Sequence, residues 1–371
     1  MQKNRKLNIR NILLSLRGLS RPLITLKSLK QLKEIRGKGN NDIQSLEHND
    51  SNIWAQAFKK LLKIYPEKIE LVESFYDSKI QLVKESENDE TTGPIIICVV
   101  KDDLERTKLI YKHHSDIGID HFVFIDNNSE DGTLEWLKKQ QNVDLYSTTE
   151  EFTSNKKYGW INKILSIYGY NQWYLYVDSD EMFVYPNYEN RSIQDYIAQL
   201  ESNQETRVAS LMVDMYSNDY VFNARDHYNI LEDYRYFDTN SYYIEKSLKG
   251  INVKGGPRLR IIKDKENTAP LLIKHPLFYF TRGEIFESAH YLFPYQFDLT
   301  LKSALLHYKF LPTDLEKYKV RAEKGNFSEG SREYKMYVKN LTERKTKFIY
   351  EESMKYNNSN SLKTIDILDF E

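Results

Sequence analysis

The chain has 371 residues, a formal net charge of −1 at pH 7 and a single cysteine, Cys98. This length allows one or two domains with a substantial core. One cysteine excludes an intrachain disulfide, which is typical of a protein from a reducing, cytoplasmic compartment. No apolar run reaches the roughly 18–20 residues that a membrane-spanning helix needs.

Residues 1–40 form a basic segment in which Glu34 is the only acidic residue. Leucines and isoleucines recur between its lysines and arginines at spacings close to the helical period, and Pro22 divides it into two pieces. Such a segment either lies on an anionic membrane, here the inner face of the cell membrane, or packs on the protein with its basic face in water. No recognisable nucleic-acid-binding fold accompanies it, so nucleic acid is not an expected partner.

Residues 41–93 favour helices, because Trp54 and Phe58 begin an apolar series at helical spacing. The polar run at residues 84–94 contains charged residues, glycine and proline, which is the composition of a linker between domains. We therefore predict a basic and helical N-terminal extension over residues 1–93.

From residue 95 onward the sequence alternates between strand and helix patterns. Continuous apolar runs predict four buried strands, at residues 95–100, 121–125, 143–146 and 173–177. Helical patterns lie between these strands, at residues 102–117, around Trp136 and at 159–168. This order implies an α/β fold with a mostly parallel, Rossmann-like sheet, helices on both faces and right-handed crossovers.

The later part of the chain has a less regular pattern. A further buried strand is expected at residues 208–215, and two helices are expected after Pro312. The predicted organisation is a central domain at residues 94–311 followed by a C-terminal helical extension at residues 312–371. The polar tail after Tyr356 is expected to fray.

Three polar clusters follow the predicted strands directly. They are Lys101-Asp102-Asp103, Asp126 to Thr133, and Asp178 to Glu181. In open α/β sheets, ligands bind outside the carboxyl ends of the strands, where the strand order reverses. We therefore expect the three clusters to belong to one ligand site.

Asp178 and Asp180 form the chemically most distinctive pair. In extended backbone they would point to the same face, with Ser179 turned aside. Two like-facing carboxylates at the end of a buried strand repel each other, and a divalent cation such as Mg, Mn or Ca removes that penalty. The alternative is a solvated turn with incidental acids, but the coincidence of three polar strand ends favours a metal site.

These motifs together resemble the GT-A glycosyltransferases of the family 2 type, in particular a bacterial subgroup associated with cell-surface polysaccharide. The loop after the second strand resembles their DDGSxDGT loop, the end of the first strand resembles a VKNE-like opening, and the two aspartates stand where their DxD motif belongs. The segments that carry the resemblance are Val99-Val100-Lys101-Asp102-Asp103, Asp126-Asn127-Asn128-Ser129-Glu130-Asp131-Gly132-Thr133, Asp178-Ser179-Asp180, Gly255-Gly256-Pro257-Arg258 and Leu305-Leu306-His307-Tyr308-Lys309-Phe310.

The resemblance covers about residues 95–340, and the chain departs from the family pattern at two places. Asn127 replaces the second aspartate of the usual loop. Glu232-Asp233 has the letters of the family's catalytic pair but precedes Gly255-Gly256, whereas the family order would place it after the glycine pair.

The resemblance implies a metal-dependent, inverting glycosyltransferase of the GT-A fold. Such an enzyme moves a sugar from a nucleotide sugar, here a UDP-sugar, to a saccharide or glycolipid acceptor in the synthesis of cell-surface glycans. It implies Asp180 as a direct metal ligand and Asp178 as a ligand of the metal, of a metal-bound water or of the ribose. His307 is implied as a third ligand, with a core histidine as the alternative. Mn is favoured over Mg if imidazole ligates.

On the donor side, the resemblance implies that Asp126 binds uracil or ribose. Lys101 would approach the nucleotide or its phosphates. Arg258 follows a glycine pair that either lets the backbone come close to a ligand or forms a plain turn, and its guanidinium would clamp the diphosphate.

On the acceptor side, inversion needs a base within hydrogen-bond reach of the acceptor hydroxyl. Glu287 and Glu284 lie about as far past the DxD motif as the family's base, and Asp214, at the end of a predicted strand, is the third candidate. Two other functions stay open. One is a non-catalytic carbohydrate-binding or scaffold protein, and the other is a sugar nucleotidyltransferase, although Lys101-Asp102-Asp103-Leu104 lacks the glycine-rich loop that such enzymes use for triphosphate.

Overall fold

The structure is a computed structural model that describes residues 48–88, 91–223, 228–261, 270–297, 300–325, 328–342 and 346–370. The basic segment at residues 1–40 lies outside the described residues. The chain divides into two compact units. The first consists of Met1–Ser78, Asn155–Tyr170 and Arg282–Phe286, and the second of Lys79–Ser154, Asn171–Thr281 and Glu287–Glu371.

The first unit is built on helices. Its elements are α3 (His48–Ile64), the 3₁₀ turn η2 (Pro66–Lys68), α4 (Ile69–Tyr76), most of α7 (Ser154–Tyr168) and β13 (Ile285–Phe286). Its core is aromatic, because the ring of Phe75 lies 4.8 Å from that of Trp54 and 4.9 Å from that of Phe58. A side chain at Gly159 would come within 2.4 Å of Ser74, so this glycine permits the close approach of α7 to α4.

The second unit contains the predicted α/β sheet. Its strands are β1 (Gln81–Lys84), β2 (Ile95–Val100), β3 (Phe122–Asp126), β4 (Val143–Ser147), β5 (Gln172–Tyr176) and β12 (Leu277–Phe280), in the order β1-β4-β3-β2-β5-β12. The four inner strands are parallel, and the two outer strands are antiparallel to their neighbours. The expected α/β fold class with a mostly parallel sheet is therefore confirmed.

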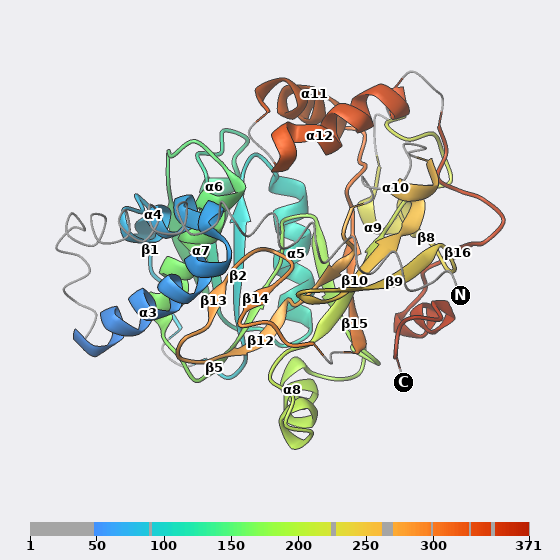
Figure 1. The fold of residues 1–371 in the computed structure, drawn as a ribbon. Helices are drawn as coiled ribbons and strands as arrows, with labels where there is room; N and C mark the ends of the chain where they lie inside the picture. Colours follow the sequence, from blue (N-terminus) through green and yellow to red (C-terminus); the bar gives the residue numbers. More distant parts are fainter. Residues whose placement is uncertain are drawn as a thin grey trace, which may run out of the picture. The chain divides into compact units, whose positions relative to one another are not determined.

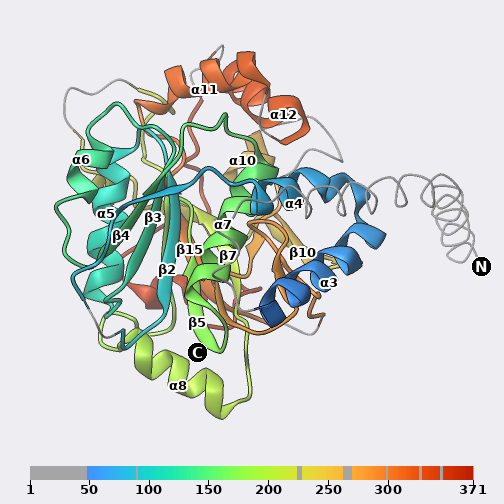
Figure 2. The same cartoon turned by 90° about the vertical axis from the view of Figure 1, so that its left-hand side faces the viewer.

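The inner strands are largely apolar and buried, as expected of a sheet that is covered on both faces. All six residues of β2 are buried, which fits the continuous apolar run rather than an alternating one. The crossovers of this sheet within the second unit include α5 (Leu104–Asp116) and α6 (Thr133–Leu137), which lie beside β3 and β4 in Figure 2. Val100 pairs with Asp126, and Asp126 pairs with Ser147, so the ends of β2, β3 and β4 meet at one edge.

A second sheet carries the other strands that matter for the site. It consists of β6 (Glu181–Val184), β7 (Ala209–Asp214), β11 (Ile273–Lys274) and β15 (Leu301–His307), in the order β11-β7-β15-β6. β15 is parallel to β7 and antiparallel to β6. Its register sets His307 opposite both Asp214 and Glu181.

The second unit contains further elements, most of which are labelled in Figure 1. They are α8 (Ile193–Ser202), α9 (Ile230–Asp233), β8 (Tyr236–Asp238), β9 (Tyr242–Ser247), β10 (Gly250–Gly255), α10 (Gly256–Ile261), β14 (Leu292–Phe293), α11 (Asp314–Lys324), α12 (Ser328–Tyr337), the π-helical turn η3 (Val338–Thr342), β16 (Ser353–Lys355) and the 3₁₀ helix η4 (Ser359–Thr364). None of the described helices combines the length and the apolar composition needed to span a membrane.

Two details of the chain's ends differ from the sequence-based expectations. β1 lies inside the predicted N-terminal extension, yet it pairs with β4 of the central sheet. The tail after Tyr356 was expected to fray, and that prediction is wrong. Leu362, Ile365 and Phe370 are buried in the main core. Burial of these apolar side chains stabilises the tail, although most of the residues between them are polar.

The glycine pair before Arg258 forms a tight turn between β10 and α10. Gly255 has a φ of 133° and Gly256 a φ of 69°. A Cβ atom at Gly255 would lie 2.0 Å from the carbonyl oxygen of Ser241, so no other residue fits there. The pair therefore serves the turn and the close packing of the chain on itself.

Candidate functional site

The turn between β5 and β6 carries the two aspartates of the DxD triplet. β5 ends at Tyr176, so Asp178 and Asp180 do not continue an extended strand. Glu181 N donates to Asp178 O at 3.1 Å, which closes the turn, and Tyr308 N donates to Asp180 O at 2.8 Å, which ties the turn to the chain after β15. The expected common face is therefore wrong, and the two carboxylates contact different partners.

Asp178 belongs to a cluster around Lys274. Lys274 Nζ lies 2.6 Å from Asp178 Oδ2 and 2.5 Å from Glu181 Oε1, and its side chain is 3% exposed. The Tyr176 hydroxyl donates to Asp178 Oδ1 at 2.5 Å, and Asp178 N donates to Glu181 Oε2 at 3.1 Å. Burial lowers the pKa of Lys274, but the two carboxylates outweigh it and raise the pKa overall. Lys274 therefore neutralises much of the negative charge on this side of the turn.

Asp180 faces His307 instead. Asp180 Oδ2 lies 3.3 Å from His307 Nε2, and His307 Nδ1 lies 2.6 Å from Asp214 Oδ1. Burial opposes ionisation of Asp180, but His307 lowers the pKa of that carboxyl well below its ordinary value. The pKa of His307 is raised, because the two aspartates outweigh the effect of burial.

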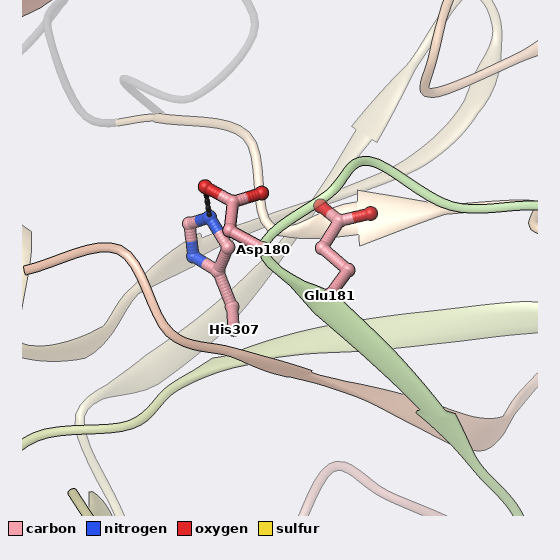
Figure 3. Close-up of side chains that lie close together, drawn as sticks. All are labelled: Asp180, Glu181 and His307. Atoms are coloured by element: carbon pink, nitrogen blue, oxygen red, sulfur yellow. Dashed lines mark ion pairs between the residues drawn. The ribbon is translucent and has the colours of Figure 1, made fainter. Parts of the chain in front are cut away.

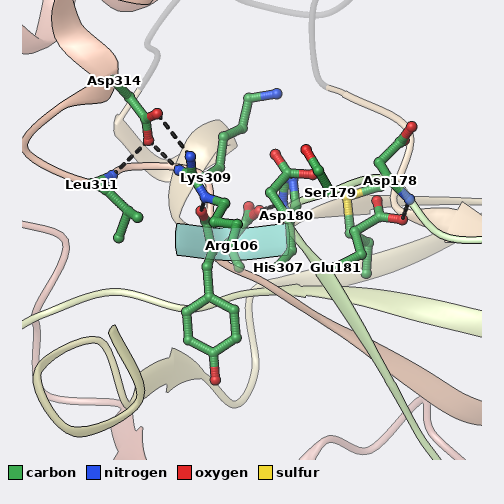
Figure 4. A network of polar contacts seen from close by, with 12 residues as sticks. Arg106, Asp178, Ser179, Asp180, Glu181, His307, Lys309, Leu311 and Asp314 are labelled. Carbon is green, nitrogen blue, oxygen red and sulfur yellow. Dashed lines mark hydrogen bonds and ion pairs between the residues drawn. The ribbon is translucent and has the colours of Figure 1, made fainter. Parts of the chain in front are cut away.

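The ligand atoms of Asp180, Glu181 and His307 all lie within 4.8 Å of one another (Figure 3). Two carboxylates and an imidazole form a donor set that suits a divalent metal such as Mn. Glu181 would contribute an oxygen by loosening its hold on Lys274 or on the Asp178 amide. Among the described residues, the predicted ligands Asp180 and His307 are thus brought together (Figure 4). Asp178 instead contacts Lys274.

Asp214 and Arg258 form a buried pair behind His307. Arg258 Nε lies 2.7 Å from Asp214 Oδ2, and their side chains are 3% and 1% exposed. Arg258 Nη1 also donates to Glu333 Oε1 at 3.0 Å. Both residues were predicted to touch substrate, Asp214 as a base and Arg258 as a diphosphate clamp. A substrate would have to displace one of these contacts to reach either of them.

The end of β3 carries a buried carboxylate oxygen that none of the described residues hydrogen-bonds. Asp126 is fully buried, and Ser129 N donates to its Oδ1 at 3.0 Å. Its Oδ2 has no hydrogen-bond partner among the described residues. Burial raises the pKa of Asp126. An unpaired buried carboxylate oxygen is costly, so a ligand that donates an N–H or O–H would be favoured there.

The loop after Asp126 explains the departure at Asn127. The side-chain nitrogen of Asn127, Nδ2, donates to the backbone carbonyls of Thr148 at 3.2 Å and Glu150 at 2.9 Å. A carboxylate cannot donate these bonds. Lys101 Nζ donates to the carbonyls of Asn127 at 3.0 Å and Asn128 at 2.8 Å, which places its ammonium over this loop.

Arg106 links the strand ends to the chain after β15. Its Nε donates to Tyr308 O at 2.9 Å, and its Nη1 lies 3.0 Å from Asp103 Oδ1 and donates to Asp314 Oδ1 at 3.0 Å (Figure 4). Ser179 Oγ donates to Asp103 Oδ2 at 2.7 Å, so the end of β2 touches the turn that carries Asp180. Sequence reasoning missed both Arg106 and Lys274. Lys274 is a basic residue within an otherwise apolar run, which was the one available signal for it, whereas Arg106 lies among polar residues and had no such signal.

The other two predicted bases lie in different units. Glu287 belongs to the second unit, where it is 1% exposed and its Oε2 lies 3.1 Å from Lys249 Nζ. Ser288 Oγ donates to the same oxygen at 3.1 Å. Glu284 belongs to the first unit. Neither glutamate is part of the Asp180–Glu181–His307 group.

No protein-family model matches the chain, and no curated protein matches its sequence. Similar solved structures include a mannosyltransferase from Pyrobaculum calidifontis in complex with GDP-Man and Mn²⁺, with 14% identity, a TM-score of 0.26, and 45% of this chain and 47% of that chain covered. HddC from Yersinia pseudotuberculosis has 11% identity and a TM-score of 0.31, and the match covers 60% of this chain and 97% of HddC. An apo UDP-glucose pyrophosphorylase has 6% identity and a TM-score of 0.26, and the match covers 68% of this chain and 88% of that protein.

The chain spans about half the length of the mannosyltransferase that it matches, since 47% of that protein is covered. Two of these proteins are described by the nucleotide sugar that they bind or act on, GDP-Man and UDP-glucose. Likeness at these TM-scores carries no argument about function.

Proposed function

We propose that this chain is a metal-dependent glycosyltransferase that moves a sugar from a nucleotide sugar, a UDP-sugar, to a saccharide or glycolipid acceptor in the synthesis of cell-surface glycans. The observation that carries the proposal is the group of Asp180, Glu181 and His307, which could hold a divalent metal. Asp103 joins this group to the strand ends through Ser179, so donor and metal would bind side by side.

The residues fit a divalent metal, and Mn in particular. Asp180 and Glu181 offer oxygen ligands, and His307 offers an imidazole nitrogen, which suits Mn better than Mg. Asp180, Glu181 and His307 would hold the metal, which would supply positive charge against the negative charge of the leaving diphosphate. The Asp180 side chain is 25% exposed, which leaves it accessible from solvent.

The nucleoside would be held at the end of β3. Asp126 offers to a donor group of the base or ribose its Oδ2, which has no hydrogen-bond partner within the described part of the chain. Lys101 holds the loop after Asp126 in place, and its side chain is 47% exposed, so its ammonium can also meet a phosphate. Of the predicted bases, Glu287 lies in the same unit as the metal group and remains the proposed base, because both oxygens of Asp214 are already bound by His307 and Arg258.

The proposal is tested by calorimetric titration of the protein with Mn²⁺, and then with UDP and GDP in the presence and absence of Mn²⁺. We expect Mn²⁺ to bind and to strengthen nucleotide binding, and Asp180→Asn to weaken Mn²⁺ binding by at least about tenfold because the metal loses a charged ligand. Asp238 is a buried aspartate elsewhere in the same unit that pairs with Arg260. Asp238→Asn is therefore a matched control, and we expect it to keep both Mn²⁺ binding and nucleotide binding.

Two results would contradict the proposal. One is an Asp180→Asn protein that binds Mn²⁺ as tightly as the unchanged chain. The other is a folded protein that binds neither nucleotide, which would favour a non-catalytic scaffold. If nucleotides bind, a screen of sugar nucleotides for metal-dependent hydrolysis identifies the donor.

A further inference from the structure

His307 is held by a carboxylate on the ring edge opposite Asp180. β15 and β7 run parallel, with His307 opposite Asp214 in the register. His307 Nδ1 lies 2.6 Å from Asp214 Oδ1, whereas Nε2 lies 3.3 Å from Asp180. The two ring nitrogens therefore have different neighbours. Nδ1 contacts the buried Asp214, and Nε2 faces Asp180 of the metal group.

This contact decides which nitrogen can bind a metal. A carboxylate accepts a hydrogen bond and cannot donate one, so Asp214 keeps a proton on Nδ1 of His307. In the neutral ring the lone pair then lies on Nε2, which is the atom that faces Asp180. Histidine ligands are commonly oriented in this way by a carboxylate behind them.

The carboxylate is itself fixed from behind. Arg258 Nε binds the other oxygen of Asp214 at 2.7 Å, and Arg258 Nη1 donates to Glu333 Oε1 on α12 at 3.0 Å. Asp214 is 1% exposed, and each of its oxygens already has a partner. This geometry does not suit a base that meets an acceptor hydroxyl, but it does suit a residue that holds another residue in place.

We propose that Asp214 is a positioning residue of the metal site, that it holds His307 with Nε2 towards Asp180, and that Arg258 and Glu333 keep it in this orientation. The inference rests on the proposed function in one respect, namely that His307 is a metal ligand. Asp214 and Arg258, which the sequence predicts to contact substrate, instead support the metal ligand His307. Helix α12 contributes to this support through Glu333.

The decisive variant is Asp214→Asn. An asparagine side chain has one acceptor oxygen, whereas His307 and Arg258 both require an acceptor. Arg258 can only donate, so the amide oxygen turns to Arg258 and the NH₂ group turns to His307 Nδ1. The histidine proton then moves to Nε2, and the lone pair no longer faces Asp180.

We expect Asp214→Asn to raise the dissociation constant for Mn²⁺ by about 10–100-fold, as measured by calorimetry or by electron paramagnetic resonance of free Mn²⁺. The dissociation constant for Mg²⁺ should change less, because Mg²⁺ depends mainly on oxygen ligands. Loss of Mn²⁺ preference is a readout that a general loss of stability would not produce.

Asp238→Asn is the matched control. Asp238 is fully buried and binds Arg260 at 2.9 Å, as Asp214 binds Arg258, but its other partners are the hydroxyls of Tyr216 and Ser241 rather than a histidine. We expect this variant to lose stability to a similar extent and to keep its Mn²⁺ affinity. Glu333→Gln, at a partly exposed position, serves if Asp214→Asn does not fold, and it should weaken Mn²⁺ binding by a few-fold.

The inference is overturned if Asp214→Asn and Glu333→Gln bind Mn²⁺ like the unchanged chain while His307→Ala does not. In that case the proposed metal site stands and only the positioning role fails. Equal loss of Mn²⁺ affinity in Asp214→Asn and Asp238→Asn also overturns it, because the effect would then be general destabilisation. If the unchanged chain and His307→Ala bind Mn²⁺ equally, the ligand role of His307 in the proposed function is what fails.

Discussion

Asp178 and Asp180 are two residues apart and almost equally exposed, at 27% and 25% of their side chains, yet the fold gives them opposite situations. Asp178 shares the ammonium of Lys274 with Glu181. Asp180 faces an imidazole that is oriented from behind by Asp214. The two aspartates of one triplet thus differ in their partners, because a lysine ammonium holds Asp178 whereas Asp180 faces an imidazole, and neither exposure nor place in a DxD triplet decides this.

The largest effect should come from removing the resident cation. Lys274→Met leaves Glu181, which is 1% exposed, without its partner, and losing one member of a buried ion pair costs about 3–5 kcal/mol in the free energy of unfolding. Urea denaturation measures this cost. Lys302, which pairs with Glu205 at 2.5 Å with side chains 32% and 24% exposed, is the control, and Lys302→Met should cost less than about 1 kcal/mol. If Lys274→Met and Lys302→Met lowered the free energy of unfolding equally, Lys274 would be no more than a surface ion-pair partner, and the contrast between Asp178 and Asp180 would fail.

A second effect separates the two aspartates directly. We expect Asp180→Asn to weaken Mn²⁺ binding by at least about tenfold, as in the test of function, and Asp178→Asn to change it by less than about threefold. Asp178→Asn should instead lower the melting temperature of the metal-free protein, because Lys274 loses one of its two carboxylates. Titration calorimetry and thermal unfolding of the same samples give both quantities. A larger loss of Mn²⁺ affinity in Asp178→Asn than in Asp180→Asn would reverse the assignment.

The smallest effect is the pH dependence of stability that comes from Glu333, the last residue in the series of contacts from His307 through Asp214 and Arg258. Burial opposes ionisation of Glu333, but Lys309 and Arg258 lower its pKa from 4.5 to about 2. Because the folded-state pKa lies below the unfolded value, ionised Glu333 stabilises the fold above about pH 4.5, and this contribution is lost as the pH falls towards 2. Denaturation of the unchanged chain and of Glu333→Gln should show a constant difference at neutral pH that closes in this acidic range. A difference that widens towards low pH would contradict the expectation.

Much of the central sheet was predictable because its strands are continuous apolar runs. The runs at residues 95–100 and 121–125 correspond closely to β2 and β3, and their parallel order places Lys101 and Asp126 at one edge. The general position of the site follows from this. Local periodicity is enough for such a result, since each strand is recognisable within its own few residues.

The partners across the site were not predictable, because they depend on pairing between distant segments. Lys274 contacts Asp178 from 96 positions away, and nothing near either residue indicates that these two residues pair. Asp214 and Arg258 each looked like a substrate contact in isolation, and only their mutual pairing shows that they support His307. The polar tail was misjudged for a related reason, because its few apolar residues find their core elsewhere in the chain.

The position of β15 has a consequence for how the protein is made. This strand completes the second sheet by entering between β7 and β6, although both of those strands leave the ribosome long before it does. Until β15 arrives, β6 and β7 lack the neighbour that pairs with them, and exposed strand edges promote aggregation of nascent chains. A chain that ends before residue 301 would carry Asp178, Asp180 and Glu181 and still be unable to assemble the site. Synthesis on the ribosome is therefore a period of risk for this fold, which ends only when β15 has emerged, within the last fifth of the sequence.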